Sequence, residues 1–350
     1  MIYFDHAAGT PATPEAAALF ARLAQEGYAN PESTHAEGRR AKGALEAAQG
    51  DLLAALVPAW RGGGVIWAAS GSDALSLIAA AVEPTAGSVR VSDFEHPSAQ
   101  AAARRSGLTP CAESAADTRL ALYTHVQSEL GLIADIDTLV AAARRRAPAV
   151  LTVVDAVQGA GKLPLSAAAD IIVISGHKLG LPGGAALLLR PGVAPDVARN
   201  LEAARRHDYL IGRPEPILAL MLTETVKSAV AQQVENLAQV DQLNRYIRDR
   251  LPDGVTPTLP SKEASPYILH LRVRGKQGAI VSRMLSNRGI MTASSSACQA
   301  EAGGPSRALL ALGLSGEAAY EGLRVSFSPA NTRAEADEFL RILKYELENY

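Results

Sequence analysis

The chain has few of the features that mark secreted, membrane-spanning or nucleic-acid-binding proteins. It contains two cysteines, Cys111 and Cys298, among 350 residues, so a disulfide framework is excluded and a reducing compartment is expected. The 34 basic and 36 acidic side chains nearly cancel, which favours neither nucleic acid nor a membrane surface as a partner. No apolar run is long enough to cross a bilayer, and the N-terminus lacks the pattern of a signal peptide. We therefore expect a cytoplasmic protein.

Metal-ligand spacing is also missing. The seven histidines are scattered and the two cysteines lie far apart, so we expect no metal site. What remains is a globular composition, with 48% hydrophobic and 20% charged residues, and a length sufficient for one large domain and a smaller one.

Apolar runs alternate with amphipathic segments between about residues 60 and 190. Several runs are apolar on both faces, which predicts a mostly parallel sheet covered by helices on both sides, an α/β fold. The expected strands are 65–69, 88–91, 120–123, 150–154, 171–174 and 185–189, and the expected helices between them are 72–82, 97–106 and 135–146.

A second kind of unit is expected toward the C-terminus. Helices at 15–27 and 36–57 precede the sheet, and a long helical stretch opens near Pro214 and Pro216 and runs to about residue 250. The turn at 251–254 then marks a boundary. Beyond it, strands near 267–273 and 323–327 and helices near 277–287 and 333–348 predict a small α+β domain. We assign 15–250 to the large domain and 1–14 with 251–350 to the small one.

The chemistry is expected at two neighbouring strand ends. Asp155 ends one buried strand, and Lys178 follows the next, at the sheet edge where α/β proteins bind ligands. A lysine that forms a Schiff base and a carboxylate that keeps a pyridine nitrogen protonated are what pyridoxal 5′-phosphate (PLP) requires. A surface lysine and a helix-capping aspartate are the alternatives. The combination of Lys178 and Asp155 with Gln158 and His177 favours PLP.

Further side chains extend this hypothesis. Gly71 and Ser72 open a helix after a strand, as in phosphate sites, although a simple N-cap has the same pattern. His96 follows the next strand and has the position of a ring that stacks on a cofactor, or of an ordinary loop histidine. Gln158 has the position of a donor to the cofactor's ring oxygen, or of a polar residue that starts a helix.

Two residues of the C-terminal part are candidates for a role in the reaction. Cys298 lies among serine, alanine and glutamine, so an exposed and reactive thiol is plausible, whereas Cys111 is expected to be structural. Arg324 lies inside an apolar strand and needs a partner, which is either a substrate carboxylate or an internal ion pair.

The order of these motifs resembles the cysteine desulfurases, which are class V aminotransferases of PLP fold type I. The resemblance runs nearly from end to end and is most specific at Asp155-x-x-Gln158 and at 175–178; the cysteine segment at 294–298 with the later Arg324 narrows it to desulfurases. The matching pieces are 3–11, 30–35, 70–72, 95–96, 125–131, 154–158, 175–178, 294–298, 305–306 and 323–326.

The resemblance implies a fold, an activity and a role for each matching residue. It implies a seven-stranded, mostly parallel sheet, a homodimer, and conversion of L-cysteine to L-alanine with sulfur held as a persulfide for an acceptor protein, as in iron–sulfur cluster assembly. Lys178 would carry the cofactor and move protons, Cys298 would take the sulfur, and Arg324 would bind the substrate carboxylate. His96 would stack on the cofactor ring and act as a catalytic residue in acid–base steps. The remaining implied cofactor contacts are Asp155 and Gln158 on the ring, and Gly71, Ser72, Ser175 and His177 at the phosphate.

The chain also departs from the family pattern. Gln127-Ser128 stands where the family has two asparagines, so we assign Gln127 to the cofactor and the substrate. Arg213 stands where a threonine reaches the partner subunit's phosphate, and we expect the arginine to bind that phosphate. These changes keep alternatives open: a class V aminotransferase, a selenocysteine or sulfinate lyase or another eliminating enzyme that acts on a different amino acid, or a relative without turnover.

Overall fold

Packing divides the chain into two units. The computed structural model describes residues 1–79, 82, 86–193, 195–207, 215–294 and 305–350. Residues 11–125 and 134–233 form one unit, here called the sheet unit, and residues 1–10, 126–133 and 234–350 form the other, here called the terminal unit. Within the described ranges, no helix is both long and apolar enough to cross a bilayer.

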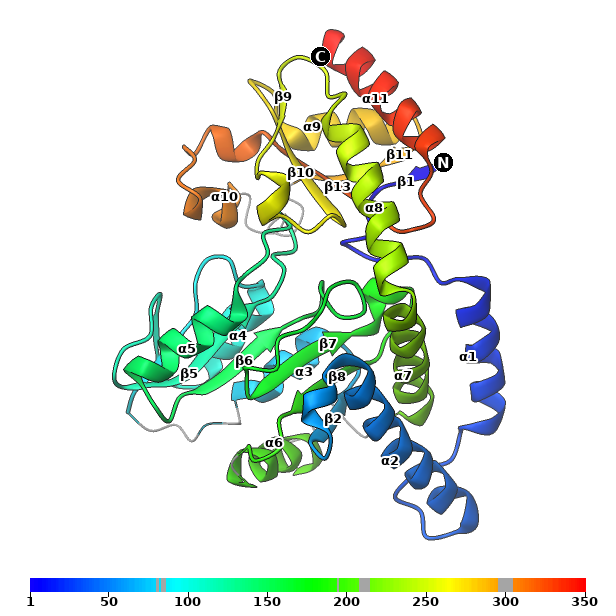
Figure 1. The fold of residues 1–350 in the computed structure, drawn as a ribbon, viewed down its shortest axis with the longest axis vertical. Coiled ribbons are helices and arrows are strands. Elements are labelled where there is room, and N and C mark those ends of the chain that lie inside the picture. The colour runs from blue at the N-terminus through cyan, green and yellow to red at the C-terminus, as the bar shows by residue number, and fades with distance from the viewer. Residues whose placement is uncertain (80–81, 83–85, 194, 208–214, 295–304) are drawn as a thin grey trace. The chain divides into compact units, whose positions relative to one another are not determined.

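The sheet unit is built on seven strands of the described chain, in the order β2-β8-β7-β6-β5-β3-β4 (Figure 1). Only β8 is antiparallel to its neighbours, so the predicted mostly parallel sheet is confirmed. The strands are β2 (Gly64–Ala68), β3 (Ser88–Arg90), β4 (Thr109–Cys111), β5 (Thr118–Thr124), β6 (Leu151–Asp155), β7 (Ile171–Ser175) and β8 (Ala185–Leu189).

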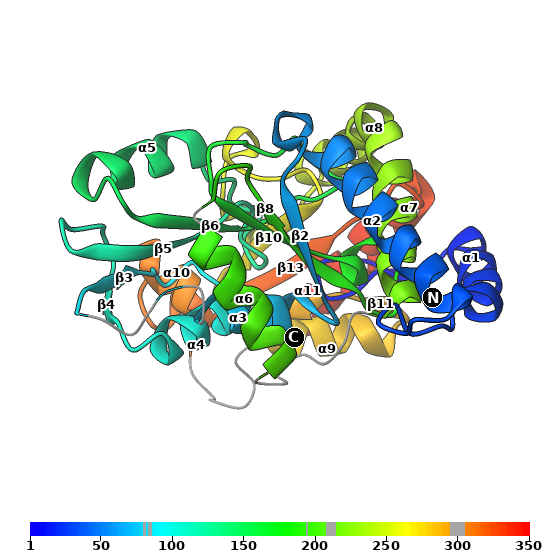
Figure 2. The same cartoon turned by 90° about the horizontal axis from the view of Figure 1, so that it is seen from below.

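Helices cover both faces of this sheet, as Figure 2 shows from below. One face packs against α1, α2, α5 and α7, and the opposite face packs against α3, α4 and α6. The central strands β7 and β8 are buried along their whole length, because each face meets a helical layer. The helices are α1 (Pro14–Glu26), α2 (Ala36–Leu56), α3 (Gly71–Ile78), α4 (Pro97–Arg105), α5 (Ile136–Arg146), α6 (Pro195–His207) and α7 (Pro216–Ala231).

Two differences from the sequence prediction concern the long helical stretch and the edge of the large sheet. The stretch expected as one helix to residue 250 is two helices, α7 and α8 (Gln233–Arg248), because the helical backbone is interrupted at Gln232. Strand β4 was not predicted. It is three residues long at the sheet edge and contains Pro110, which has no N–H to pair and weakens the strand signal.

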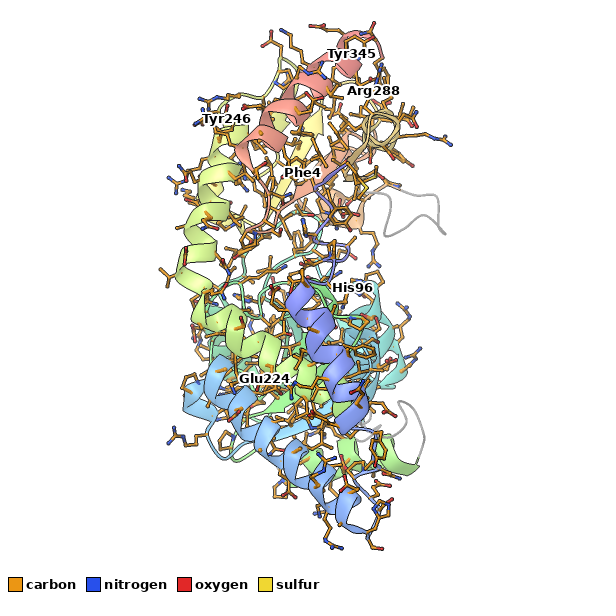
Figure 3. The ribbon with its side chains drawn as sticks, turned by 90° about the vertical axis from the view of Figure 1, so that its right-hand side faces the viewer. Phe4, His96, Glu224, Tyr246, Arg288 and Tyr345 are labelled. Atoms are coloured by element: carbon orange, nitrogen blue, oxygen red, sulfur yellow. The ribbon has the colours of Figure 1, made fainter. Side chains whose placement is uncertain are left out.

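The terminal unit carries a smaller antiparallel sheet, in the order β12-β13-β10-β9, and the parallel pair β1-β11. Phe4 packs edge-on against Phe327 and Phe339, with ring centroids 5.5 and 5.7 Å away, in the core of this unit (Figure 3). The elements are β1 (Ile2–Tyr3), β9 (Val255–Pro257), β10 (Ile268–Val273), β11 (Ile290–Met291), β12 (Ala293–Ser294), β13 (Gly322–Ser326), α9 (Gly278–Asn287), α10 (Arg307–Ala311) and α11 (Arg333–Glu348).

The N-terminal segment is held against the end of β13. The Ser326 N–H donates to the Phe4 carbonyl at 2.8 Å, and the Ser326 hydroxyl accepts from the Ala7 N–H at 2.9 Å. Asp5 forms an isolated parallel bridge with Ser326. The first residues of the chain therefore have a fixed place beside this strand.

Candidate active site

Asp155 and Lys178 lie at the carboxyl ends of adjacent strands. Asp155 is the last residue of β6 and pairs in register with Val173 of β7. Ser175 ends β7, and a 3₁₀ turn, Gly176–Leu179, carries Lys178 directly after it. Parallel neighbours deliver their carboxyl ends to the same sheet edge, which brings the two residues together as the sequence predicted.

Asp155 is a buried carboxyl group with no ion pair recorded within the described ranges. Its Oδ1 accepts the Val157 N–H at 3.0 Å. Burial raises the pKa of Asp155; the Val157 hydrogen bond, His96 and Lys178 act in the opposite direction. A buried carboxyl of this kind gains most from a cation that is brought to it.

His96 is both a helix cap and a neighbour of this pair. Its Nδ1 accepts the Ser98 N–H at 3.2 Å at the start of α4, so the neutral ring carries its proton on Nε2. His96 keeps an exposed surface (labelled in Figure 3), yet burial lowers its pKa, with Lys178 acting in the same direction and Asp155 in the opposite one. A neutral, partly open imidazole suits stacking and proton transfer.

The helix α3 begins beside the ends of β6 and β7. Its N-cap is Ser70, whose hydroxyl accepts the Asp73 N–H at 3.1 Å, so the exposed Ser72 hydroxyl is not needed for capping. A Cβ on Gly71 would lie 3.1 Å from Val157 Cγ2 and 3.4 Å from Ser175 Cβ, so glycine permits this close approach. A helix N-terminus with glycine and free hydroxyls is suited to a phosphate.

Further basic groups surround Lys178. The Ser175 hydroxyl and His177 Nδ1 are 2.8 Å apart. Burial lowers the pKa of His177 to about 4, with Lys178, Lys162 and His96 acting in the same direction. Lys162 was not predicted: it is buried, and burial together with Lys178 lowers its pKa to about 7. The signal in the sequence is a lysine within the small and apolar run 159–163.

This set of residues fits PLP. A dianionic phosphate would meet the α3 N-terminus, Ser72, Ser175 and His177, and a cationic ring nitrogen would meet the buried Asp155 carboxyl. Gln158 is buried three residues after Asp155 and supplies an amide at the same edge. The site has an excess of basic groups over acids, which is the electrostatic environment that an anionic cofactor requires.

Arg324 lies in the terminal unit and has an internal ion pair, one of the two partners considered from the sequence. It is 4% exposed. Its Nη2 donates to Asp5 Oδ1 at 2.7 Å and its Nη1 donates to the Ser128 carbonyl at 2.9 Å. Its Nε is buried and has no hydrogen-bond acceptor among the residues that the structure describes.

Gln127 belongs to the same unit, and its side chain forms hydrogen bonds with the neighbouring backbone. Its Oε1 accepts the N–H groups of Glu129 and Leu130 at 2.8 and 2.6 Å. The side chain is buried. Its amide oxygen is therefore occupied, and only the Nε2 end remains for the predicted contact with a ligand.

Two predicted residues, Cys298 and Arg213, lie outside the described residues. Cys111 is half-buried on the edge strand β4, and its Sγ lies 3.4 Å from the Val89 carbonyl. Within the described ranges, no group of three or more potential metal ligands is found.

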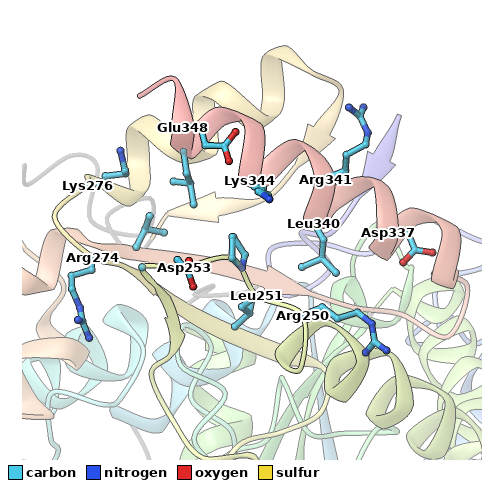
Figure 4. Close-up of a pocket in the computed structure, with 14 residues that line it drawn as sticks. Arg250, Leu251, Asp253, Arg274, Lys276, Asp337, Leu340, Arg341, Lys344 and Glu348 are labelled. Carbon is cyan, nitrogen blue, oxygen red and sulfur yellow. The ribbon is translucent and has the colours of Figure 1, made fainter.

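A hollow of about 670 Å³ in the terminal unit involves none of the predicted site residues (Figure 4). It lies between α11 and the loops that flank β9 and β10, and its walls mix cations such as Arg274 and Lys344 with anions such as Asp253 and Glu348. Its chemistry does not match that of the sheet edge.

Comparisons with known proteins agree with the geometry. Residues 112–202 match the family model described as aminotransferase class-V. The chain is 28% identical to an IscS-like cysteine desulfurase of Mycobacterium tuberculosis, over 98% of this chain and 95% of that protein. It is 27% identical to a cysteine desulfurase of Gluconacetobacter diazotrophicus, over 98% of this chain and 92% of that protein.

Solved structures show the same fold. The superposition on a NifS-like protein covers the full length of both chains, with a TM-score of 0.84 and 20% sequence identity. The superposition on a NifS-like protein from Rickettsia africae also covers both chains in full, with a TM-score of 0.82 and 20% sequence identity. The predicted PLP fold type I is confirmed. The class V match over residues 112–202 and the similarity to curated cysteine desulfurases support a cysteine desulfurase family for this chain.

Proposed function

We propose that this protein is a PLP-dependent cysteine desulfurase that converts L-cysteine to L-alanine and transfers the sulfur to Cys298. The observation that carries the proposal is the cluster at the sheet edge, where Lys178 and the buried Asp155 lie among neutral or weakly basic imidazoles. The two relatives named above are cysteine desulfurases, and the chain matches each of them over nearly its whole length, which supports the same activity here.

Each residue has a defined task in this proposal. When bound, PLP supplies an electron sink for the charge left on the substrate's Cα. Lys178 Nζ would hold the cofactor's aldehyde carbon and then move the Cα proton. The Asp155 carboxylate would hold the proton on the ring nitrogen, and Gln158 would donate to the ring oxygen. His96 would pack on the ring and shield it from water.

The sulfur step belongs to Cys298. Its thiolate would attack the substrate sulfur, so that the new S–S bond forms as the substrate's C–S bond breaks and Cβ takes a proton. Arg324 would hold the substrate carboxylate. An acceptor protein would then remove the sulfur atom from Cys298. We also propose a cytoplasmic homodimer in which Arg213 binds the partner's cofactor phosphate.

The test is incubation of the PLP-loaded protein with L-cysteine, with alanine quantified and the thiols mapped by mass spectrometry. We expect alanine, a persulfide on Cys298, and loss of both in Cys298→Ala. Cys111→Ala is the matched control and should retain activity, because Cys111 lies on an edge strand. Alanine formation at the parent rate by Cys298→Ala, or keto-acid products from an amino-acid panel, would contradict the proposal.

A further inference from the structure

Asp5 is the strongest feature that the proposed function does not use. Its Oδ1 lies 2.7 Å from Arg324 Nη2, and this is the one ion pair recorded for Arg324 among the described residues. The arginine side chain is 5% exposed and the aspartate side chain is 21% exposed. A buried guanidinium thus has a counter-ion with partial access to water.

The pair is held by its surroundings. The Ser128 carbonyl fixes Nη1 of the guanidinium from the segment 126–133, and the bonds from Ser326 to Phe4 and Ala7 fix the backbone on either side of Asp5. The Tyr3 hydroxyl donates to the Gly9 carbonyl at 2.9 Å, which closes this N-terminal segment. The position of the Asp5 carboxylate therefore follows from the fold and needs no flexible reach.

Within the described residues, Asp5 forms the one ion pair recorded for Arg324, and the buried Glu129 carboxylate lies 3.9 Å from His270 Nε2 instead. His270 faces Arg324 across the antiparallel pair β10–β13, but burial, Arg324 and Arg272 lower the pKa of His270 to about 3, so this imidazole is neutral. Arg272 itself pairs with Glu321 at 2.7 Å. Asp5 is thus the carboxylate that pairs directly with Arg324.

A ligand carboxylate at Arg324 would create a conflict. Two carboxylates beside one buried guanidinium leave a net negative charge, and like charges at this distance are costly. Among the described residues, Arg324 Nε has no acceptor, and the Asp5 side chain is 21% exposed, so a ligand carboxylate can replace Asp5 at the guanidinium.

We infer that Asp5 is an exchangeable counter-ion that occupies Arg324 in the free protein and sets the affinity of this arginine for a ligand carboxylate. The inference deepens the proposed function, because it rests on Arg324 as the substrate-carboxylate residue. It makes Asp5 a positioning and affinity-setting residue rather than a catalytic one. It also implies that the free protein avoids an unpaired buried cation by using its own N-terminal segment.

The test compares L-alanine with L-alaninamide, which lacks the carboxylate, as ligands of the PLP-loaded protein by calorimetry. The Asp5→Asn variant should bind L-alanine about tenfold more tightly than the parent, because the competing carboxylate is gone. Its affinity for L-alaninamide should change less than about twofold. Asp5→Glu should bind both like the parent. Asp253→Asn, an exposed carboxylate of the same unit, is the matched control and should change neither.

A second variant guards against misfolding of Asp5→Asn. Ser326→Ala keeps both charges but removes the hydroxyl that accepts the Ala7 N–H. The segment around Asp5 is then held less firmly, so the affinity for L-alanine should rise about twofold, as it does in Asp5→Asn. Equal changes for both ligands, unchanged or weaker L-alanine binding in Asp5→Asn, or a parent that binds neither ligand would each overturn the inference. A shifted L-alanine to L-alaninamide ratio without cysteine turnover would instead reject the desulfurase activity and keep the inference.

Discussion

Two aspartates, one in each unit, show how the same side chain is prepared for opposite tasks. Asp155 is buried at the end of β6, has no ion pair within the described ranges, and has a pKa raised by burial. Asp5 is partly exposed and lies 2.7 Å from a guanidinium nitrogen. The sheet unit therefore contains a buried carboxyl group without a paired cation among the described residues, whereas the terminal unit contains a buried guanidinium that already has a counter-ion. A cofactor should consequently complete the first site, and a ligand must compete at the second.

The largest effect is expected at Lys178. Lys178→Ala should reduce turnover roughly a thousandfold or more, because loss of a central catalytic group removes the reaction path itself. Borohydride reduction of the PLP-loaded protein should label a peptide that contains Lys178 in the parent and none in the variant.

Lys227→Ala is the matched control for that experiment. Lys227 lies on the same unit but pairs at the surface with Asp51 and Glu224, at 2.9 and 3.1 Å. It should keep parent activity and labelling. Label on another lysine in the parent would show that the basic cluster at the sheet edge is not the cofactor site.

Asp155→Asn tests the contrast between the two aspartates directly. Turnover should fall roughly a hundredfold or more, the size of losing one preorganised electrostatic contact. The cofactor-free variant should nevertheless be at least as stable as the parent at pH 7 to 8, because burial raises the pKa of Asp155 and stability is therefore lost as pH rises through that pKa. Asp5→Asn should show the reverse and be destabilised, by about 3 kcal/mol, because it leaves Arg324 buried without a counter-ion.

Urea unfolding of the two cofactor-free variants at pH 7.5 measures this difference. The asparagine in the first variant retains an oxygen for the Val157 N–H, so the hydrogen bond is preserved in the comparison. Destabilisation of both variants by the same amount would remove the distinction on which the comparison rests.

The sequence predicted those parts of the fold and site that depend on local pattern. Buried strands such as 171–174 are continuous apolar runs, and Lys178 and Asp155 follow such runs, so their shared edge was predictable from the parallel topology. Lys162 and the pairing of Asp5 with Arg324 were not predicted. The first has no motif of its own, and the second joins residues 319 positions apart, a contact that no spacing rule indicates. The interruption at Gln232 was missed because both flanking segments are good helix formers.

A smaller effect is expected at His270, the neutral neighbour of Arg324. Its pKa is lowered to about 3 from an ordinary value of 6.5, so the unfolded chain takes up a proton at a pH where the folded chain does not. Stability is therefore lost as pH falls from about 6.5 toward 3. Between pH 6.5 and 4, the free energy of unfolding of His270→Asn should fall by about 3 kcal/mol less than that of the parent, because this proton uptake is absent.

Urea midpoints at several pH values test this prediction. Asparagine keeps an acceptor for the Thr258 hydroxyl, which lies 2.6 Å from His270 Nδ1. His35→Asn is the control, since His35 is an exposed N-cap and asparagine caps equally well. Equal pH dependence in His270→Asn and the parent would show that burial, with Arg324 and Arg272, does not keep this imidazole neutral.

The smallest effects separate two serines at the start of α3. Ser72→Ala should weaken PLP binding roughly fivefold with little change in stability, because its exposed hydroxyl is available to the phosphate. Ser70→Ala should do the opposite and lower the free energy of unfolding by about 1 kcal/mol, because Ser70 caps the helix through the Asp73 N–H. Fluorescence titration with PLP and urea unfolding of both variants distinguish the roles. If both serines affected stability alone, the α3 N-terminus would be an ordinary capped helix start, and the excess of basic groups at the sheet edge would have to bind the phosphate without it.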